Sequence, residues 1–497
     1  MFKKILIANR GEIAVRIIRA CKELSITSVS IYSEIDKYAL HSRLADESYY
    51  IGESLPSESY LNQNKIIDLA KEINADAIHP GYGFLSENAS FIKKVEESGI
   101  VFIGPSSKSV EMMGSKTAAR DLMKRNGVPI VPGTTEKIAS LESAKQNANE
   151  IGYPILLKAS SGGGGKGMKR VYAEDELEAA FSSAQREALK AFGDDSIYIE
   201  KLVEHPKHIE VQIIADKFGN YCHLFERECS VQRRHQKVIE EAPSTFIDEQ
   251  TREKLTTAAI NAAKACGYYN AGTIEFLVDK HKNFFFLEMN TRLQVEHPVT
   301  EFISGIDLVK EQIKIAAGEK LSFVQKDLRI LGHAIECRVY AEDPENNYLP
   351  ITGTVEYHRL PSGPNIRIDR GIETGSEISR FYDPLLSKVS VMEKQRNASI
   401  KRMDIALNDY LIAGIKTNIT FLKRILQNEK FRNGKYTINL IEEDFSGDVS
   451  GDAKNQHQTD LETVAAVFSA YLKQQPQNHK ASKVVYSNNK WTDLQYE

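Results

Sequence analysis

The hydrophobic pattern at the start of the chain predicts alternating strands and helices. A short apolar run at residues 4–8 (KILIA) is followed by a turn and by residues 12–24, in which apolar side chains recur at helical spacing. Further apolar runs at residues 28–32 and 77–78 repeat this order. We therefore expect a parallel sheet wrapped by helices up to about residue 112. The segment lacks G-x-G-x-x-G, which argues against dinucleotide binding.

A smaller module with a glycine-rich loop is predicted next, after a helix at residues 117–125. A strand at residues 155–158 leads into SSGGGGKGM, and another strand follows at residues 196–200. Four consecutive glycines lose much conformational entropy when they become ordered. This loop is therefore either a flexible linker or a mobile cover over a ligand.

The remaining pattern predicts one larger body and a polar tail. Residues 209–317 are rich in strand patterns, and residues 330–436 alternate short strands with helices. After about residue 444 the sequence becomes polar, and it then offers a short amphipathic helix at residues 461–472 and the only tryptophan, Trp491. Such a tail is typical of a linker with a small appendage.

Residues 272–290 (GTIEFLVDKHKNFFFLEMN) predict a β-hairpin that carries acidic side chains. If residues 280–283 form a four-residue turn, residue 279 pairs with 284, 277 with 286 and 275 with 288. Glu275 and Glu288 then lie opposite each other, and their charges repel unless a cation lies between them. Hard oxygen ligands on rigid strands suit Mg²⁺, which shares its coordination shell with substrate phosphates.

The alternation continues beyond this hairpin. If the backbone stays extended, one face carries a varied polar set, and the opposite face is apolar, which favours a packed sheet over a solvent-facing strand edge with surface ion pairs. The polar positions are Glu288, Asn290, Arg292, Gln294 and Glu296, and the apolar positions are Leu287, Met289, Leu293 and Val295.

Composition and charge narrow the class of protein. A chain of 497 residues with 41% hydrophobic and 27% charged residues is typical of a globular protein of two or three domains. Its formal net charge of −4 offers no positive field for nucleic acid or an anionic membrane. The five cysteines are scattered without C-x-x-C spacing, which favours a reducing compartment over a disulfide framework. No signal peptide or run of 18 apolar residues is apparent, so we expect a cytoplasmic protein.

Three features are ambiguous when each is taken alone. Lys158 precedes the glycine run, where a lysine and backbone N–H groups can cradle phosphate, but a surface lysine explains it equally well. Lys116 lies in GSKT, which lacks the P-loop pattern, so an ATP site must be of another kind. The charged run at residues 226–241 is typical of a solvated surface, and His208 and Cys229 are singly more often structural.

Several longer motifs together resemble the biotin carboxylase family of ATP-grasp enzymes. In chain order they are KILIANRGEIAVRIIRACKEL, HPGYGFLSEN, FIGPSS, SSGGGGKGM, ERECSVQRRHQKVIEEAP, AGTIEFL, LEMNTRLQVEHPVTE and GHAIECRVYAEDP. The resemblance implies an α/β and α+β multidomain fold over residues 1–444. Its expected parts are an N-terminal doubly wound domain (1–112), an ATP-grasp domain (113–317) with a mobile glycine-rich lid (about 131–203), a C-terminal biotin carboxylase domain (318–446) and a linker and partner-docking tail (447–497).

The resemblance also implies the roles of individual residues. Glu296 is expected to be the catalytic base, with Arg292, Arg338 and Lys237 as the other catalytic residues. Bicarbonate and biotin are expected against Lys237, Arg292, Gln294, Val295 and Arg338. Two Mg²⁺ or Mn²⁺ ions are expected at Glu275, Glu288 and Asn290. The expected ATP-binding residues are Lys116, Lys158, Gly164, Gly165, Glu200, Lys201, Leu202, Val203, His208, Gln232, His235, Glu275 and Glu288.

The activity implied by the resemblance is carboxylation of biotin by ATP and bicarbonate. Carboxyphosphate forms and breaks down to CO₂ and phosphate, the phosphate takes the ureido proton of biotin, and Arg338 stabilises the resulting enolate. The chain has no A-M-K-M biotinylation segment, so biotin is expected on a separate carrier protein. A carboxyltransferase subunit would pass the carboxyl group to acetyl-CoA, propionyl-CoA, pyruvate or another acceptor. Arg19 and Glu23 match positions of the family's homodimer interface.

Two other classes of protein remain as alternatives. Another ATP-grasp ligase, such as a carbamoyl-phosphate-forming enzyme, would also activate bicarbonate, but it should be longer and internally duplicated. A catalytically dead scaffold subunit should have lost some of Lys237, Glu288, Arg292 and Glu296, and all four are present. The tail resembles the start of the linker region in acyl-CoA carboxylase α-subunits, and a dispensable disordered end is the alternative for it.

Overall fold

The computed structural model describes residues 1–445 apart from residues 135, 136, 139 and 160–167. Residues 1–446 form a compact unit of their own. The predictions made for Gly164, Gly165, the helix at residues 461–472 and Trp491 therefore lie outside the described residues. No helix in the described part of the chain is both long and apolar enough to span a membrane.

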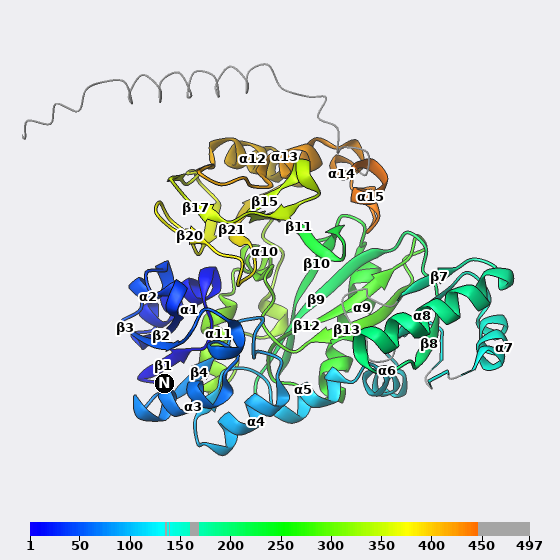
Figure 1. The fold of residues 1–497 in the computed structure, drawn as a ribbon, viewed down its shortest axis with the longest axis horizontal. Coiled ribbons are helices and arrows are strands. Elements are labelled where there is room, and N and C mark those ends of the chain that lie inside the picture. Colours follow the sequence, from blue (N-terminus) through cyan, green and yellow to red (C-terminus); the bar gives the residue numbers. More distant parts are fainter. Residues whose placement is uncertain (135–136, 139, 160–167, 446–497) are drawn as a thin grey trace, which may run out of the picture. The chain divides into compact units, whose positions relative to one another are not determined.

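A five-stranded parallel sheet begins the fold (Figure 1). The first strand faces two separate cores. Ile5 and Ile7 pack with α1 (Gly11–Glu23), whereas Leu6 and Ala8, the residue after the strand, pack with α3 (Gln63–Glu72) and α4 (Ala89–Glu97). The predicted doubly wound domain is thereby confirmed. In spatial order the strands are β3 (Glu47–Gly52), β2 (Thr27–Ser33), β1 (Lys4–Ile7), β4 (Ala77–His79) and β5 (Val101–Phe102).

Two of these strands escaped the sequence analysis for simple reasons. The β3 segment, ESYYIG, mixes polar and aromatic residues, and β5 contains only two residues. Four helices of this region begin at polar caps: Asn62, Asn88, Ser106 and Ser115 each accept the backbone N–H three residues further on. The helices of this region are α1 (Gly11–Glu23), α2 (Leu40–Leu44), α3 (Gln63–Glu72), α4 (Ala89–Glu97), α5 (Ser107–Gly114) and α6 (Lys116–Arg125).

A small module follows, as the pattern around the glycine run predicts. Its antiparallel sheet packs Ile155, Leu157 and Ile199 against two helices in a core of its own. The strands lie in the order β7 (Lys169–Val171), β6 (Ile155–Ala159) and β8 (Ile197–Lys201), and the helices are α7 (Leu141–Ile151) and α8 (Leu177–Phe192).

The larger body is built on one antiparallel sheet of eight strands (Figure 1). Strand β11 pairs with β14, and this pairing makes the two sequence blocks predicted for this body parts of one sheet. The order is β13 (Phe284–Asn290), β12 (Asn270–Val278), β9 (Lys207–Ala215), β10 (Tyr221–Arg233), β11 (Gln236–Ala242), β14 (His333–Tyr340), β21 (Leu385–Glu393) and β19 (Ile366–Arg370). The associated helices are α9 (Glu249–Ala265), α10 (His297–Ser304) and α11 (Leu308–Ala316).

The C-terminal part of the unit covers the far end of this sheet. Its core joins residues of β14 and β21 to residues of α12 and α13. The helices are α12 (Arg396–Asp409), α13 (Ile419–Gln427), α14 (Glu429–Arg432) and α15 (Leu440–Phe445). Three short antiparallel pairs complete it, namely β15 (Glu342–Asp343) with β16 (Leu349–Pro350), β17 (Gly353–Thr354) with β20 (Glu377–Ile378), and β18 (Tyr357–Arg359) with β22 (Leu411–Ala413).

The observed pairing of the β12–β13 hairpin differs from the predicted register at two of three positions. Residue 278, not 279, pairs with 284, and residue 276, not 277, pairs with 286, so the turn is one residue longer than expected. A β-bulge then places one extra residue, Leu287, on β13, and the pairing of Glu275 with Glu288 is restored. The prediction that the two carboxylates oppose each other is therefore confirmed. It holds because the longer turn and the bulge offset each other.

Candidate functional site

A cleft of about 680 Å³ lies where the small module, the eight-stranded sheet and the C-terminal part of the unit meet. Most of the expected site residues line it. The side chain of Lys116 and the whole of Gly164 and Gly165 lie outside the described residues. Glu296 does not line the cleft, because it is completely buried beneath the surface. The expected residues that line the cleft are Lys158, Glu200, Lys201, Leu202, Val203, His208, Gln232, His235, Lys237, Glu275, Glu288, Asn290, Arg292, Gln294, Val295 and Arg338.

One end of the cleft is formed by the neighbouring strands β6 and β8. Lys158 and Arg120 both form ion pairs with Glu200, whose carboxylate is nearly fully buried. Lys201 donates hydrogen bonds to the backbone oxygens of Gly152 (2.9 Å) and Tyr153 (2.7 Å). Residues 200–203 thus present backbone and side chains to the cleft directly beside a lysine ammonium, an arrangement that can receive a base and its phosphates together.

The middle of the cleft is organised by one cation among three carboxylates. The ammonium of Lys237 lies 2.5 Å from Glu210, 2.9 Å from Glu275 and 2.5 Å from Glu296. Burial by itself would lower the pKa of Lys237, but these carboxylates raise it well above its usual value. Lys237 is consequently a permanent cation that holds the acidic side chains of three different segments together.

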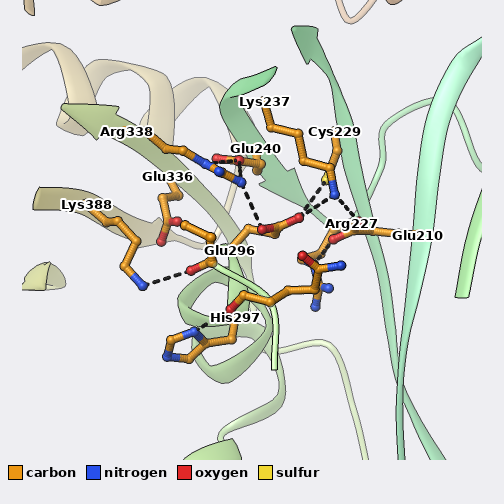
Figure 2. Close-up of polar contacts among 12 residues, drawn as sticks. Glu210, Arg227, Cys229, Lys237, Glu240, Glu296, His297, Glu336, Arg338 and Lys388 are labelled. Carbon is orange, nitrogen blue, oxygen red and sulfur yellow. Dashed lines mark hydrogen bonds and ion pairs between the residues drawn. The ribbon is translucent and has the colours of Figure 1, made fainter. Parts of the chain in front are cut away.

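Glu296 occupies the N-cap position of α10, although its side chain makes no capping hydrogen bond. Its carboxylate instead accepts hydrogen bonds from Lys237 at 2.5 Å and from Arg338 at 2.9 Å (Figure 2). Burial would raise the pKa of Glu296, but Lys237, Arg338 and Arg227 lower it well below its usual value. The strand that precedes it ends at Asn290, so the extended backbone expected as far as residue 296 is not formed.

Arg292 is held by partners on two sides. Its Nε donates to Glu87 at 2.7 Å, and its terminal nitrogens donate to Gln294 at 3.0 Å and to Asn290 at 3.1 Å. Burial would lower the pKa of Arg292, whereas Glu87 raises it. The guanidinium is therefore a fixed cation at the cleft surface.

A divalent cation fits the paired carboxylates of the hairpin. Asn290 donates to Glu275 at 2.8 Å, so its amide lies beside the Glu275–Glu288 pair. Two carboxylates and an amide oxygen on adjacent strands form the hard oxygen donor set that Mg²⁺ prefers. Two other clusters, one of His208, Glu210 and Glu275 and one of Glu210, Cys229 and Glu296, also bring ligand atoms together. Both contain carboxylates bound by Lys237, as the hairpin pair does through Glu275, so this cation does not distinguish between the sites.

Several residues that support the site were not identified from the sequence. Each of them is a charged partner of an expected residue, and each is supplied by a segment distant in the chain. Glu210 and Glu240 carried a weak signal, because they are acidic residues at buried positions of β9 and β11. Glu87 lies within the HPGYGFLSEN motif. The partners are Glu87 of Arg292, Arg120 of Glu200, Glu210 of Lys237, and Glu240 of Arg338.

The fold and the cleft define an ATP-grasp enzyme, in which a small α/β module and a larger sheet enclose a site rich in cations and acidic ligands. Family models match almost the whole compact unit. Residues 1–110 match "Biotin carboxylase, N-terminal domain", residues 115–324 match "Carbamoyl-phosphate synthase L chain, ATP binding domain", and residues 336–443 match "Biotin carboxylase C-terminal domain". The chain belongs to the biotin carboxylase family.

Known relatives resemble the chain over most of its length. Biotin carboxylase 2 of Bacillus subtilis is 53% identical over 443 residues, 89% of this chain and 100% of that protein. A pyruvate carboxylase subunit of Methanothermobacter thermautotrophicus is 50% identical over 472 residues, 95% of this chain and 96% of that protein. A solved dimer of the biotin carboxylase domain of Hydrogenobacter thermophilus 2-oxoglutarate carboxylase, in complex with MgADP, ADP and bicarbonate, has a TM-score of 0.86 at 50% identity and covers 91% of this chain and 100% of its own.

Proposed function

We propose that the chain is the biotin carboxylase subunit of a multi-subunit carboxylase and that it carboxylates biotin on a separate carrier protein. The observation that carries this proposal is the ion cluster in which Lys237 and Arg338 hold the buried carboxylate of Glu296 below a cleft lined by Arg292. The MgADP and bicarbonate bound by the similar Hydrogenobacter domain support the same substrates here. A carboxyltransferase subunit would complete the reaction.

The first task of this site is to bring two anions together. Bicarbonate is a poor nucleophile and ATP carries several negative charges, so their approach requires fixed positive charge. Arg292 and Lys237, which both line the cleft, are proposed to supply it, and Gln294 and the backbone of Val295 to complete the bicarbonate site. Lys158, Lys116, His208, His235 and the lid glycines are proposed to hold the phosphates and ribose, and residues 200–203 the adenine.

Glu296 is proposed to act as the base. It accepts the proton of bicarbonate while a bicarbonate oxygen forms a bond to the γ-phosphorus and the bond from that phosphorus to ADP breaks. The products are carboxyphosphate and ADP. Because Lys237 and Arg338 keep Glu296 ionised, the base is in its reactive form at every working pH, and the same cations favour the deprotonated substrate.

Glu275, Glu288 and Asn290 are proposed to hold two Mg²⁺ or Mn²⁺ ions. When bound, such ions offset the negative charge of the phosphates. The oxygen donors of this hairpin fit that role, and their rigid placement comes from the paired strands that carry them.

The second half of the reaction falls to Arg338. Carboxyphosphate breaks down to CO₂ and phosphate, and phosphate takes the ureido proton of biotin. The enolate so formed carries negative charge on oxygen, which the guanidinium of Arg338 can neutralise until the deprotonated ureido nitrogen forms a bond to CO₂ and carboxybiotin results. Glu240 forms an ion pair with Arg338 at 2.5 Å. This pair fixes the guanidinium, which also lines the cleft. The lid is proposed to exclude water from these intermediates.

The domain boundaries and partners of the chain are also proposals. We place domains at residues 1–112, 113–317 and 318–446, close to the limits of the matching family models. The dimer of the similar Hydrogenobacter domain supports a homodimer for this chain, with Arg19 and Glu23 at its interface. We place the protein in the cytoplasm, and the five free, buried cysteines fit such a reducing compartment.

Residues 447–497 are proposed to dock a partner subunit. Support comes from the Methanothermobacter pyruvate carboxylase protein, whose similarity covers 95% of this chain and therefore extends past residue 446. The test is to purify the chain with and without residues 447–497 and to measure its assembly with the carrier and carboxyltransferase subunits. Loss of assembly supports the proposal, and unchanged assembly of the shortened chain contradicts it.

Turnover by the purified chain tests the activity itself. ADP release with Mg²⁺ is measured with and without bicarbonate, with and without free biotin, and for wild type beside Glu296→Ala. The proposal predicts bicarbonate-dependent release that biotin stimulates and that collapses in the variant. If biotin and a biotinylated carrier both fail to stimulate a folded, ATP-binding chain, the enzyme is a different ATP-grasp ligase.

A further inference from the structure

A buried lysine outside the described catalytic set contacts the backbone next to Glu296. Lys388 lies on β21 and is completely buried. Its ammonium donates a hydrogen bond of 2.8 Å to the backbone oxygen of Val295 (Figure 2). A buried ammonium needs hydrogen-bond acceptors within the protein. One acceptor of Lys388 is a main-chain carbonyl in the turn that carries Glu296, the proposed base.

This turn lacks the support that helix starts usually have. Glu296 is the N-cap of α10, but its carboxylate accepts hydrogen bonds from Lys237 and Arg338. No side-chain cap therefore fixes the start of the helix. Three other bonds hold the turn instead. The backbone N–H of His297 donates to the backbone oxygen of Gln294 at 3.3 Å, and two side chains contribute the others. The ring Nδ1 of His297 lies 2.8 Å from the backbone oxygen of Gln294, and Lys388 binds the next carbonyl, that of Val295. The two peptide oxygens that precede Glu296 are thereby fixed in succession.

Other contacts of Lys388 come from other regions of the compact unit, among them the ring of Tyr82 at 5.8 Å. Glu12 of α1 lies 3.2 Å from the ammonium, and Asp369 of β19 lies 3.8 Å from it. Neither carboxylate oxygen of Glu12 has a hydrogen-bond partner among the described residues. The ion pair with Lys388 therefore compensates the negative charge of Glu12. Close packing brings α1 there, because a Cβ at Gly371 would lie 2.8 Å from the backbone nitrogen of Glu12. The N-terminal region, the C-terminal region and the base-bearing turn therefore meet at one ammonium.

We propose that Lys388 is a positioning residue of the carboxylation reaction: its ammonium holds the Val295 carbonyl, and thereby Glu296, in place, and ties that turn to helix α1 through Glu12. This inference rests on the proposed role of Glu296 as the base. Reacting groups must be held within a fraction of an ångström, and a displacement of about 1 Å can cost about a hundredfold in rate. Lys388 touches no substrate in this account and acts only through the turn.

The test is a double-mutant cycle on the full chain. Bicarbonate-dependent ADP release with free biotin, ATP affinity and the thermal midpoint are measured for Lys388→Met, Glu296→Ala and the double variant. Lys22→Met is the matched control, because Lys22 also donates to a backbone oxygen, that of Leu44 at 2.7 Å, but far from the turn. We expect Lys388→Met to lower kcat by about ten- to a hundredfold at unchanged ATP affinity, and to cost nothing further when Glu296 is already alanine.

The outcomes separate the inference from the function on which it rests. If Glu296→Ala retains wild-type turnover, the assignment of the base is wrong. If Glu296→Ala keeps only a small, measurable turnover but Lys388→Met matches Lys22→Met, Lys388 is structural and the inference fails. The inference also fails if Lys388→Met causes its full loss of kcat again in the Glu296→Ala background. Should Lys388→Met not fold, Glu12→Gln replaces it, since it keeps the lysine and removes only its tie to α1. We then expect a smaller loss of kcat, about two- to tenfold, that again disappears in the Glu296→Ala background.

Discussion

The chemistry proposed for this protein depends on a carboxylate that is buried and nevertheless charged. Glu296 is removed from water completely, and an isolated carboxylate in such a place would take up a proton. Two cations, Lys237 and Arg338, reverse that tendency. The contrast with Glu240 is informative, because burial raises the pKa of Glu240 to about 7 even though Arg338 opposes the shift. Two buried carboxylates that both form an ion pair with Arg338 therefore behave differently, since one is permanently ionised and the other is partly neutral.

Glu296→Gln should therefore abolish the base while preserving the shape of the site. We expect kcat to fall by about 10²- to 10⁴-fold, the usual contribution of general base catalysis, with little change in ATP affinity. Steady-state ADP release and ATP binding measure the two effects separately. Glu319→Gln, an exposed acid, is the control. A variant with wild-type kcat would show that bicarbonate loses its proton to another group.

At the scale of single elements, the β12–β13 hairpin sets the position of the proposed metal ligands. The long turn would shift every later pair by one residue, and the bulge at Leu287 restores the register just before Glu288. Glu288 consequently faces Glu275. A regular hairpin with this turn would have offered Leu287 in its place.

Glu288→Ala should accordingly weaken metal binding without weakening the fold. We expect the Mg²⁺ concentration for half-maximal ADP release to rise at least about tenfold, because one of two carboxylate ligands is lost. The thermal midpoint without metal should stay the same or rise, since a like-charge repulsion with Glu275 is removed. Titration with Mg²⁺ at saturating ATP and bicarbonate makes the measurement. An unchanged Mg²⁺ requirement would place the metal elsewhere.

Glu241 ties several elements together at the far end of the same sheet. On β11, it accepts hydrogen bonds from His333 of β14, Arg396 of α12 and Tyr436. Burial would raise its pKa, but His333 and Arg396 lower it from 4.5 to about 2. A lowered folded-state pKa stabilises the fold above the unfolded pKa, by about 3 kcal/mol for such a shift, and this contribution is lost as the pH falls towards 2.

Glu241→Gln should thus lower the thermal midpoint most at neutral pH. We expect the difference from wild type to be full at pH 7 and to shrink progressively below about pH 4.5. Thermal unfolding of both proteins across that range is the measurement, with the exposed Glu319→Gln as control. A deficit that is the same at pH 7 and pH 3.5 would mean that lost packing, and not charge, accounts for it.

Sequence patterns predicted elements better than their junctions. The strand-then-helix order, the small module and the hairpin follow from the spacing of apolar residues, which depends only on local geometry. The partners of the site residues depend on tertiary contacts. Glu87 reaches Arg292 from 205 positions away, and no spacing rule relates the two. The bulge at Leu287 and the missed strand β3 are further cases in which packing, and not pattern, decides the structure.

At the scale of the whole molecule, the described residues of the proposed site belong to one compact unit, residues 1–446. Every described site residue lies in that compact unit, and the C-terminal family model ends at residue 443. The core of the C-terminal part closes with Leu440 and Ile441 of α15.

A chain ended at residue 446 should therefore keep its stability and its activity on free biotin. We expect its thermal midpoint to lie within about 2 °C of the full chain and its kcat within about twofold, because only the proposed docking segment is removed. Side-by-side unfolding and ADP-release measurements decide this. A large loss in either would show that residues 447–497 contribute to the catalytic unit itself.

The central claim is that a bicarbonate oxygen attacks the γ-phosphate of ATP within this cleft. The most direct measurement uses bicarbonate labelled with ¹⁸O and determines the label in the phosphate released during turnover with biotin. Formation and breakdown of carboxyphosphate predict that each phosphate carries one oxygen from bicarbonate, and that Glu296→Gln lowers the rate of this transfer. Phosphate without bicarbonate oxygen would mean that water attacks ATP directly, and the proposed reaction would be contradicted.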